Sequence, residues 1–202
     1  VHACRYCGLL IESVVAHGHA RHLDPSISTS VLHTYYMAGD YGRALDEGHR
    51  TSDPIESRVL YALGRDADAI DAARREEARF ASVPRLQSFA TALRASLEGR
   101  RDDALAALGA LEASGFRDGE GLFYVAELYS QIGEAEHARR SLENVANAGF
   151  VCLAVFDRDP FLAPVRGCDW WINLRERVRV AHEAARTAFD EVGGPEARGV
   201  TS

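Results

Sequence analysis

The residues with the most chemical potential in this 202-residue chain lie near its amino terminus. Cys4 and Cys7 form a Cys-x-x-Cys pair, and His19 and His22 share one face of a helix because they are three residues apart. Thiolates and imidazoles are ligands for zinc, and a Cys-x-x-Cys pair can also be redox-active. This Cys4/Cys7/His19/His22 cluster is therefore a candidate metal- or redox-sensing module.

The rest of the sequence does not complete such a site. Cys152 and Cys168 lie far along the chain, whereas a structural zinc site usually brings a second ligand pair close by. A thioredoxin-like motif needs a preceding strand, and none is indicated. We therefore expect no metal and no cofactor, and we interpret the cysteines as small, buried apolar side chains.

Adjacent acids are the next candidates for chemistry. Glu76 and Glu77, like Asp102 and Asp103, are neighbours in sequence, so on a helix their side chains point about 100° apart and do not converge on a substrate. We expect them to be solvated, with Asp102 and Asp103 in a first helical turn. The common phosphate-binding and hydrolytic motifs are missing from the sequence. The chain is therefore predicted to have no catalytic residues and not to be an enzyme.

Composition narrows the classes of partner. The formal net charge is −7, and the arginines are interleaved with acids, so no basic face for nucleic acid is expected. The longest strongly apolar run, 150–156, is too short to span a membrane. Four cysteines give no disulfide framework, which favours a cytoplasmic location. The chain begins at Val1 without a charged and then apolar leader, so we expect no signal peptide and a fragment of a longer protein.

One short sequence motif recurs along the first two thirds of the chain. A glycine is followed five positions later by a small residue. Successive glycines are 31, 25, 35 and 34 residues apart, and the last two intervals match a 34-residue helical-hairpin repeat. Glycine tolerates the left-handed φ that ends a helix, and a small residue lets two helices cross closely. The five pairs are Gly8 and Ser13, Gly39 and Ala44, Gly64 and Ala69, Gly99 and Ala104, and Gly133 and Ala138.

The flanking stretches have helical periodicity. A helix is predicted over Ser26–Ala38, and apolar side chains at i, i+3, i+4 and i+7 predict another from Leu122 to Tyr129. Breaks are predicted at 23–25, 52–54, 83–84 and 115–121, where proline or glycine interrupts the pattern. Few stretches alternate with period two, so the sequence predicts an all-α fold.

The pattern changes after residue 150. Asp159-Pro160 and Ala163-Pro164 interrupt an irregular segment, and a long amphipathic helix is predicted from about Trp170 to Val192. One side of that helix carries Trp171, Leu174, Val178 and Ala181, which we expect to cap the last repeat, with Trp170 partly exposed. Residues 193–202 are predicted to be a disordered tail. The predicted divisions are 1–150 for the repeats, 151–192 for the segment and cap, and 193–202 for the tail.

These repeats resemble the tetratricopeptide repeat family. The resemblance covers about residues 1–150 and is clearest at Gly8–Pro25 and Gly121–Ala148. The segment after residue 149 resembles the ending of repeat regions at the C-termini of bacterial serine/threonine kinases, nucleotide cyclases and transcriptional regulators. The resemblance implies an α-α superhelix of about five helix pairs plus a C-terminal capping helix, acting as a scaffold within a larger cytoplasmic signalling protein.

The resemblance also implies a concave groove lined by the first helix of each pair, and a peptide or protein domain, including one from the same polypeptide, as its partner. The alternative is a dimerisation module for an upstream domain, suggested by the Trp pair and the terminal helix. Two further groove-side residues in the first pair would be His2 and Arg5, and one in the fourth pair would be Ser96. The main groove residues implied are His33, Tyr36, Arg58, Tyr61, Phe89, Leu93, Phe123, Glu127 and Ser130.

Overall fold

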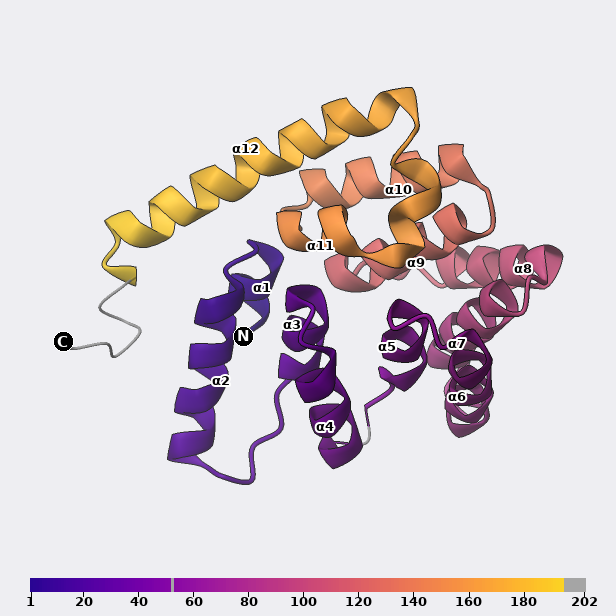
Figure 1. The fold of residues 1–202 in the computed structure, drawn as a ribbon, viewed down its shortest axis with the longest axis horizontal. Helices are drawn as coiled ribbons and strands as arrows, with labels where there is room; N and C mark the ends of the chain where they lie inside the picture. The colour runs from indigo at the N-terminus through magenta and orange to yellow at the C-terminus, as the bar shows by residue number, and fades with distance from the viewer. Residues whose placement is uncertain (52, 195–202) are drawn as a thin grey trace.

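The structure is a computed structural model that describes residues 1–51 and 53–194. All regular structure within this part of the chain is helical, which confirms the all-α prediction (Figure 1). The first ten helices are α1 (His2–Tyr6), α2 (Leu10–Leu23), α3 (Val31–Ala38), α4 (Tyr41–Thr51), α5 (Glu56–Ala62), α6 (Asp66–Arg79), α7 (Pro84–Leu97), α8 (Arg101–Ala113), α9 (Gly119–Gln131) and α10 (Ala135–Asn147). The C-terminal elements are α11 (Leu153–Arg158), the 3-10 helix η1 (Pro160–Val165) and α12 (Asp169–Glu191).

The helices up to α10 pack in adjacent pairs in the order of the sequence. The five predicted hinge glycines all have a left-handed backbone, with φ between 71° and 81°. The five small residues that follow them, Ser13, Ala44, Ala69, Ala104 and Ala138, are all completely buried. Both residues of the recurring motif therefore have the predicted role: the glycine ends one helix, and the small residue allows the next helix to pack closely.

Most predicted boundaries agree with the structure, with one clear correction. Helix α3 begins at Val31, not at Ser26. Asp24 holds residue 26 in a local turn, since its Oδ1 accepts bonds from the Ser26 backbone N at 2.9 Å and the Ser26 hydroxyl at 2.6 Å. Such side-chain bonds compete with helix formation. Of the predicted break at 52–54, residue 52 lies outside the described residues.

Residues 150–165, called here the inner segment, fold back across the first helices of the pairs. The backbone N of Val151 donates to the Tyr6 carbonyl at 2.7 Å, α11 packs on α3, and η1 packs on α9. The buried apolar side chains of this segment belong to the main core of the protein. They are Phe150, Val151, Cys152, Val155, Phe156, Phe161, Leu162 and Val165.

Helix α12 crosses the molecule from α10 and α11 to α1 and α2 (Figure 1). As predicted, Trp171 is buried and Trp170 is half-buried, but Ala181 is exposed. Ala181 borders a hollow of about 430 Å³ between α12 and α10. Contact resumes at His182, whose Nδ1 lies 2.8 Å from the Cys7 carbonyl. The terminal helix thus touches the first helix pair as well as the last.

Candidate functional site

The residues predicted to line a groove do lie together on one side of α3, α5, α7 and α9, called here the inner face. They do not form an open surface, because the inner segment covers them. His33, Tyr61 and Phe89 are half-buried. The open groove expected from the sequence is therefore corrected: the chain itself fills it. The buried members of the predicted set are Tyr36, Arg58, Leu93, Phe123, Glu127 and Ser130.

Arg58 forms the charged centre of this face. Its Nη1 donates to Glu127 Oε2 at 2.5 Å, and the side chains are 4% and 0% exposed. The guanidinium also lies over the rings of Tyr124 at 4.1 Å and Phe161 at 5.1 Å, measured to the ring centroids. A buried cation needs such compensation, and a carboxylate together with aromatic faces provides it.

Asp159 and Phe161 of the inner segment are seated on this centre. Tyr36 donates its hydroxyl to Asp159 Oδ2 at 2.8 Å, and Asp159 Oδ1 accepts from the Phe161 backbone N at 2.9 Å, which caps η1. The Phe161 ring lies 4.4 Å from that of Tyr61. An Asp-Pro-Phe sequence is thus held by side chains from two separate helices, α3 and α5.

The apolar part of the segment packs beside this polar contact. The ring of Phe123 lies 4.9 Å from that of Phe150 and 5.3 Å from that of Phe156. Burying rings of this size is worth about 1.5–3 kcal/mol each. The inner segment is therefore held by apolar burial as well as by Asp159.

The pKa values of the two carboxyl groups near Arg58, those of Glu127 and Asp159, are both raised. Burial raises the pKa of Glu127 well above its ordinary range, and the nearby Asp159 adds to this rise while Arg58 opposes it. Burial also raises the pKa of Asp159, against the lowering effects of its hydrogen bonds and of Arg58. Two like charges this close do not both ionise readily when water is excluded. Glu127 and Asp159, called here the carboxyl pair, therefore titrate as a unit.

A second buried arginine lies at the amino-terminal end of the inner face. The Arg5 side chain is fully buried, and its Nη2 donates to Glu120 Oε2 at 2.6 Å. Its Nη1 donates to the Ser30 carbonyl at 3.0 Å and to Thr34 Oγ1 at 3.2 Å. Arg5 therefore ties α1 to α3 and to α9. This Arg5 centre fixes the first helix pair against the fifth.

Sequence reasoning missed four members of these centres. Glu120 stands in the first turn of a helix, where an acid is expected for its effect on the helix dipole. Tyr124 lies within the helix predicted from Leu122 to Tyr129 but outside its apolar stripe, and Asp159 and Phe161 flank a proline whose position predicts only a break. The available signal was the combination of an acid, a proline and an aromatic residue in an otherwise apolar stretch.

The amino-terminal Cys/His cluster is not assembled in the structure. No group of three His, Cys, Asp or Glu side chains in residues 1–51 and 53–194 is arranged to hold a metal ion. His19 and His22 are exposed. Cys152 is buried, and burial raises its pKa to about 11, which disfavours a reactive thiolate. Cys4, Cys7 and Cys168 are only half-buried, so the prediction of buried thiols is corrected for these three.

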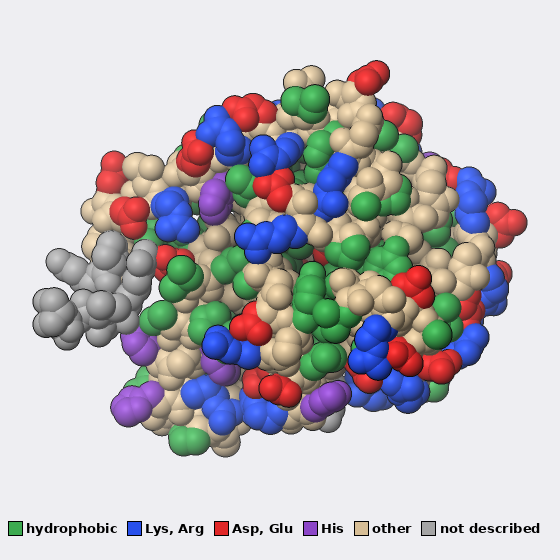
Figure 2. Space-filling model, viewed as in Figure 1, with side chains coloured by type: hydrophobic (Ala, Val, Ile, Leu, Met, Phe, Trp, Pro, Cys, Tyr) green, Lys and Arg blue, Asp and Glu red, His purple; other side chains and the backbone are tan. Residues whose placement is uncertain are grey.

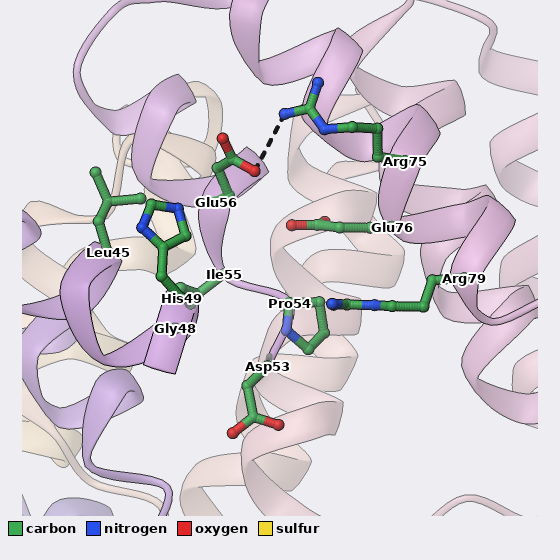
Figure 3. A pocket seen from close by; sticks show the side chains of 10 residues that line it. All are labelled: Leu45, Gly48, His49, Asp53, Pro54, Ile55, Glu56, Arg75, Glu76 and Arg79. Carbon is green, nitrogen blue, oxygen red and sulfur yellow. Dashed lines mark hydrogen bonds and ion pairs between the residues drawn. The ribbon is translucent and has the colours of Figure 1, made fainter. Parts of the chain in front are cut away.

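A separate hollow of about 310 Å³ opens between α4, α5 and α6 (Figure 3). Glu76 lies at this hollow and is buried, contrary to the expected solvation. Its carboxyl accepts from the Ser57 backbone N at 3.2 Å and from the Ser57 hydroxyl at 2.6 Å, and burial raises its pKa. Arg75 on the rim pairs with Glu56 at 3.1 Å. These charged groups already have partners, so the hollow has the character of a gap between neighbouring hairpins.

The outer surface shows no block of one charge on the face that Figure 2 displays. Acidic and basic side chains alternate there, as the sequence predicts. None of the described helices is both long and apolar enough to cross a membrane.

Comparisons of this chain with known proteins found no match. No protein-family model matches the chain, no curated protein does, and no solved structure does.

Proposed function

We propose that this chain is a protein-interaction scaffold of the tetratricopeptide kind, a superhelical array whose inner face binds a peptide segment within a larger cytoplasmic signalling protein. In this chain the occupant is its own inner segment. The observation that carries the proposal is the seating of Asp159 and Phe161 on Tyr36, Arg58 and Tyr61.

The arrangement of the helix pairs supports the scaffold. Five left-handed glycines and five buried small residues set the pairs side by side, and the recognising side chains all come from first helices of pairs. Arginine and tyrosine are the residue types most often found at binding hot spots. The proposed role is non-catalytic, because the buried charged groups of the inner face are engaged with one another.

A peptide-binding experiment tests this proposal on the full chain. The protein is the variant Asp159→Asn/Phe161→Ala, in which the internal segment is weakened but present. The probe is a fluorescein-labelled peptide of residues 150–167, with a scrambled peptide as control. We expect the variant to bind the probe at least about tenfold more tightly than the wild type, whose inner face is occupied.

A matched variant removes polar contacts of similar size away from the inner face. Arg65→Ala loses the exposed pair with Asp68 and should leave probe binding at the wild-type level. Circular dichroism checks that each variant keeps its helix content. Equal affinity of wild type and Asp159→Asn/Phe161→Ala for the probe, with both folded, contradicts recognition by the inner face.

A dimerisation module is the second candidate, favoured by one observation on α12. Ile172 and Val180 are 73% and 52% exposed although they are large and apolar. Since Trp171 is buried, a contact between subunits would use these two residues. Sedimentation velocity over a concentration series should detect a dimer that Ile172→Glu/Val180→Glu abolishes. A wild type that stays monomeric throughout the series excludes it.

A further inference from the structure

The Arg58 centre contains more negative groups than positive ones. Among the described residues, Arg58 is the one cation that pairs with a carboxyl group of this pair: it donates to Glu127, while the Asp159 carboxyl accepts from Tyr36 and from the Phe161 backbone N. The Arg58 and Glu127 side chains are 4% and 0% exposed, and Asp159 is 3% exposed. An unbalanced charge in a region that excludes water is strongly unfavourable. The pair is therefore neutralised best when it holds one proton.

The other groups facing the pair do not remove this imbalance. Tyr36 from α3 donates its proton in a hydrogen bond to Asp159, and burial raises the pKa of Tyr36, so it stays neutral. Tyr124 from α9 is likewise buried and neutral, with a raised pKa. Arg166, which follows η1, is half-buried and donates to backbone carbonyls, at 2.7 Å for that of residue 159.

The more distant neighbours do not change the balance of positive and negative charges either. His33 from α3 bonds to Tyr124, and burial lowers the pKa of its imidazole, which keeps it neutral near pH 7. Tyr41 from α4 and Tyr61 from α5 are half-buried phenols with raised pKa values, chiefly because of burial. A proton on the carboxyl pair is therefore the remaining way to neutralise the excess negative charge around Arg58.

Building on the proposed function, we infer that seating of the inner segment is linked to a proton: Glu127 and Asp159 share one proton while the segment is seated, and the proton is lost when Asp159 leaves. The inner face is then a pH-responsive binding site that holds its occupant more tightly at low pH and less tightly as the pH rises.

The direction of the pH effect follows from which state of the inner segment binds the proton more tightly. Both carboxyl groups bind protons more tightly in the seated state than in water, so seating takes up a proton. The seated state is fully favoured below the ordinary carboxyl pKa and loses this advantage as the pH rises through the raised value of the pair. Between the ordinary carboxyl pKa and the raised value of the pair, the open-to-seated ratio should rise about tenfold for each pH unit, as for one proton, and above the raised value it should level off.

The Arg5 centre provides a matched control within the same molecule. One arginine there faces one carboxylate, Glu120, and the remaining partners are hydroxyl and carbonyl groups and the His2 imidazole, whose pKa is lowered chiefly by burial. Its charges balance without an added proton. A variant of Glu120 therefore perturbs a buried ion pair of similar burial without changing the proposed proton link.

Hydrogen-exchange mass spectrometry on the full chain tests the inference. Protection factors are measured from pH 6 to pH 9.5 after correction for intrinsic exchange, for peptides from residues 150–167 and from α10 as reference. In the wild type we expect protection of the inner segment, relative to α10, to fall by about tenfold per pH unit and to level off once the pH exceeds the raised pKa of the carboxyl pair.

Three variants decide the result. Glu127→Gln and Asp159→Asn each remove one carboxylate and should flatten this slope, and either suffices if the other does not fold. Glu120→Gln should keep it. A wild type without the slope, or a Glu127→Gln protein that keeps it, overturns the inference. No peptide is added, so failure of the peptide-binding experiment leaves this result intact, and the converse also holds.

Discussion

The two buried arginines of the inner face have the same side chain but opposite surroundings. Arg5 is held by directed hydrogen bonds to Glu120, Ser30 and Thr34. Arg58 donates to Glu127 and is otherwise surrounded by the faces of aromatic rings. The first arrangement suits a permanent tie between helix pairs. The second accepts a segment that brings its own aromatic ring and carboxyl group.

This comparison indicates how one array of helices can contain both a fixed joint and a less directional contact. Directed bonds to backbone and hydroxyl groups fix geometry, since each requires its own angle. Ring faces and a carboxyl pair tolerate small changes in position, because cation–π and ionic attraction depend weakly on angle. The predictions below test whether the two centres differ in this way.

The largest difference is expected when each arginine is replaced by methionine. Arg58→Met leaves two buried carboxyl groups without a cation and should lower the free energy of unfolding by about 3–5 kcal/mol. Arg5→Met leaves Glu120 with a remaining donor in Tyr124 at 3.3 Å and should lower it by about 2–3 kcal/mol. Urea unfolding followed by circular dichroism measures both. Equal losses would remove the distinction.

Lysine substitutions should reverse the order of the two centres. Arg58→Lys keeps the ion pair and the attraction to the rings, so we expect a loss of about 1 kcal/mol. Arg5→Lys loses the forked geometry that reaches Glu120, Ser30 and Thr34 together, so about 2 kcal/mol is expected. The same unfolding assay applies. A larger loss for Arg58→Lys would show that its bond to Glu127 is the more directional one.

A single hydroxyl group tests the contact between the recognition site and its occupant. Tyr36→Phe removes the donor to Asp159 and should lower the free energy of unfolding by about 1–2 kcal/mol, since the acceptor is buried. Tyr61→Phe removes an acceptor for half-buried Gln131 and should have about half that effect. An effect of Tyr36→Phe below that of Tyr61→Phe would argue that Asp159 finds another donor.

The smallest effect gives the baseline for the series. Arg65 and Asp68 form an exposed pair, with side chains 57% and 55% exposed. Arg65→Ala should change the free energy of unfolding by no more than about 0.5 kcal/mol. A larger change would mean that charge removal alone perturbs this protein, and the differences between the buried centres would then need that correction.

The sequence predicted the local features of the fold well. Gly39 and Ala44, for example, act within one hairpin, so a stretch of six residues carries the information. The occupant of the inner face was not predicted, because the bond between Tyr36 and Asp159 joins residues 123 positions apart. Burial of Glu76 was missed for a similar reason, since its partner Ser57 lies on another helix. Pairings of this kind depend on how helices stack, which periodicity does not specify.

The course of α12 has a mechanical consequence. An array of helix pairs joined only to their neighbours can lengthen like a spring, with a small rotation at every joint. Here α12 packs on α10, where Arg177 donates to Asn147 at 2.7 Å, and it reaches α1 and α2, where Arg186 lies 3.9 Å from Glu12. A force applied to the ends of the array must detach α12 before the contacts between helix pairs can open. The protein should therefore resist small forces stiffly and yield in one step.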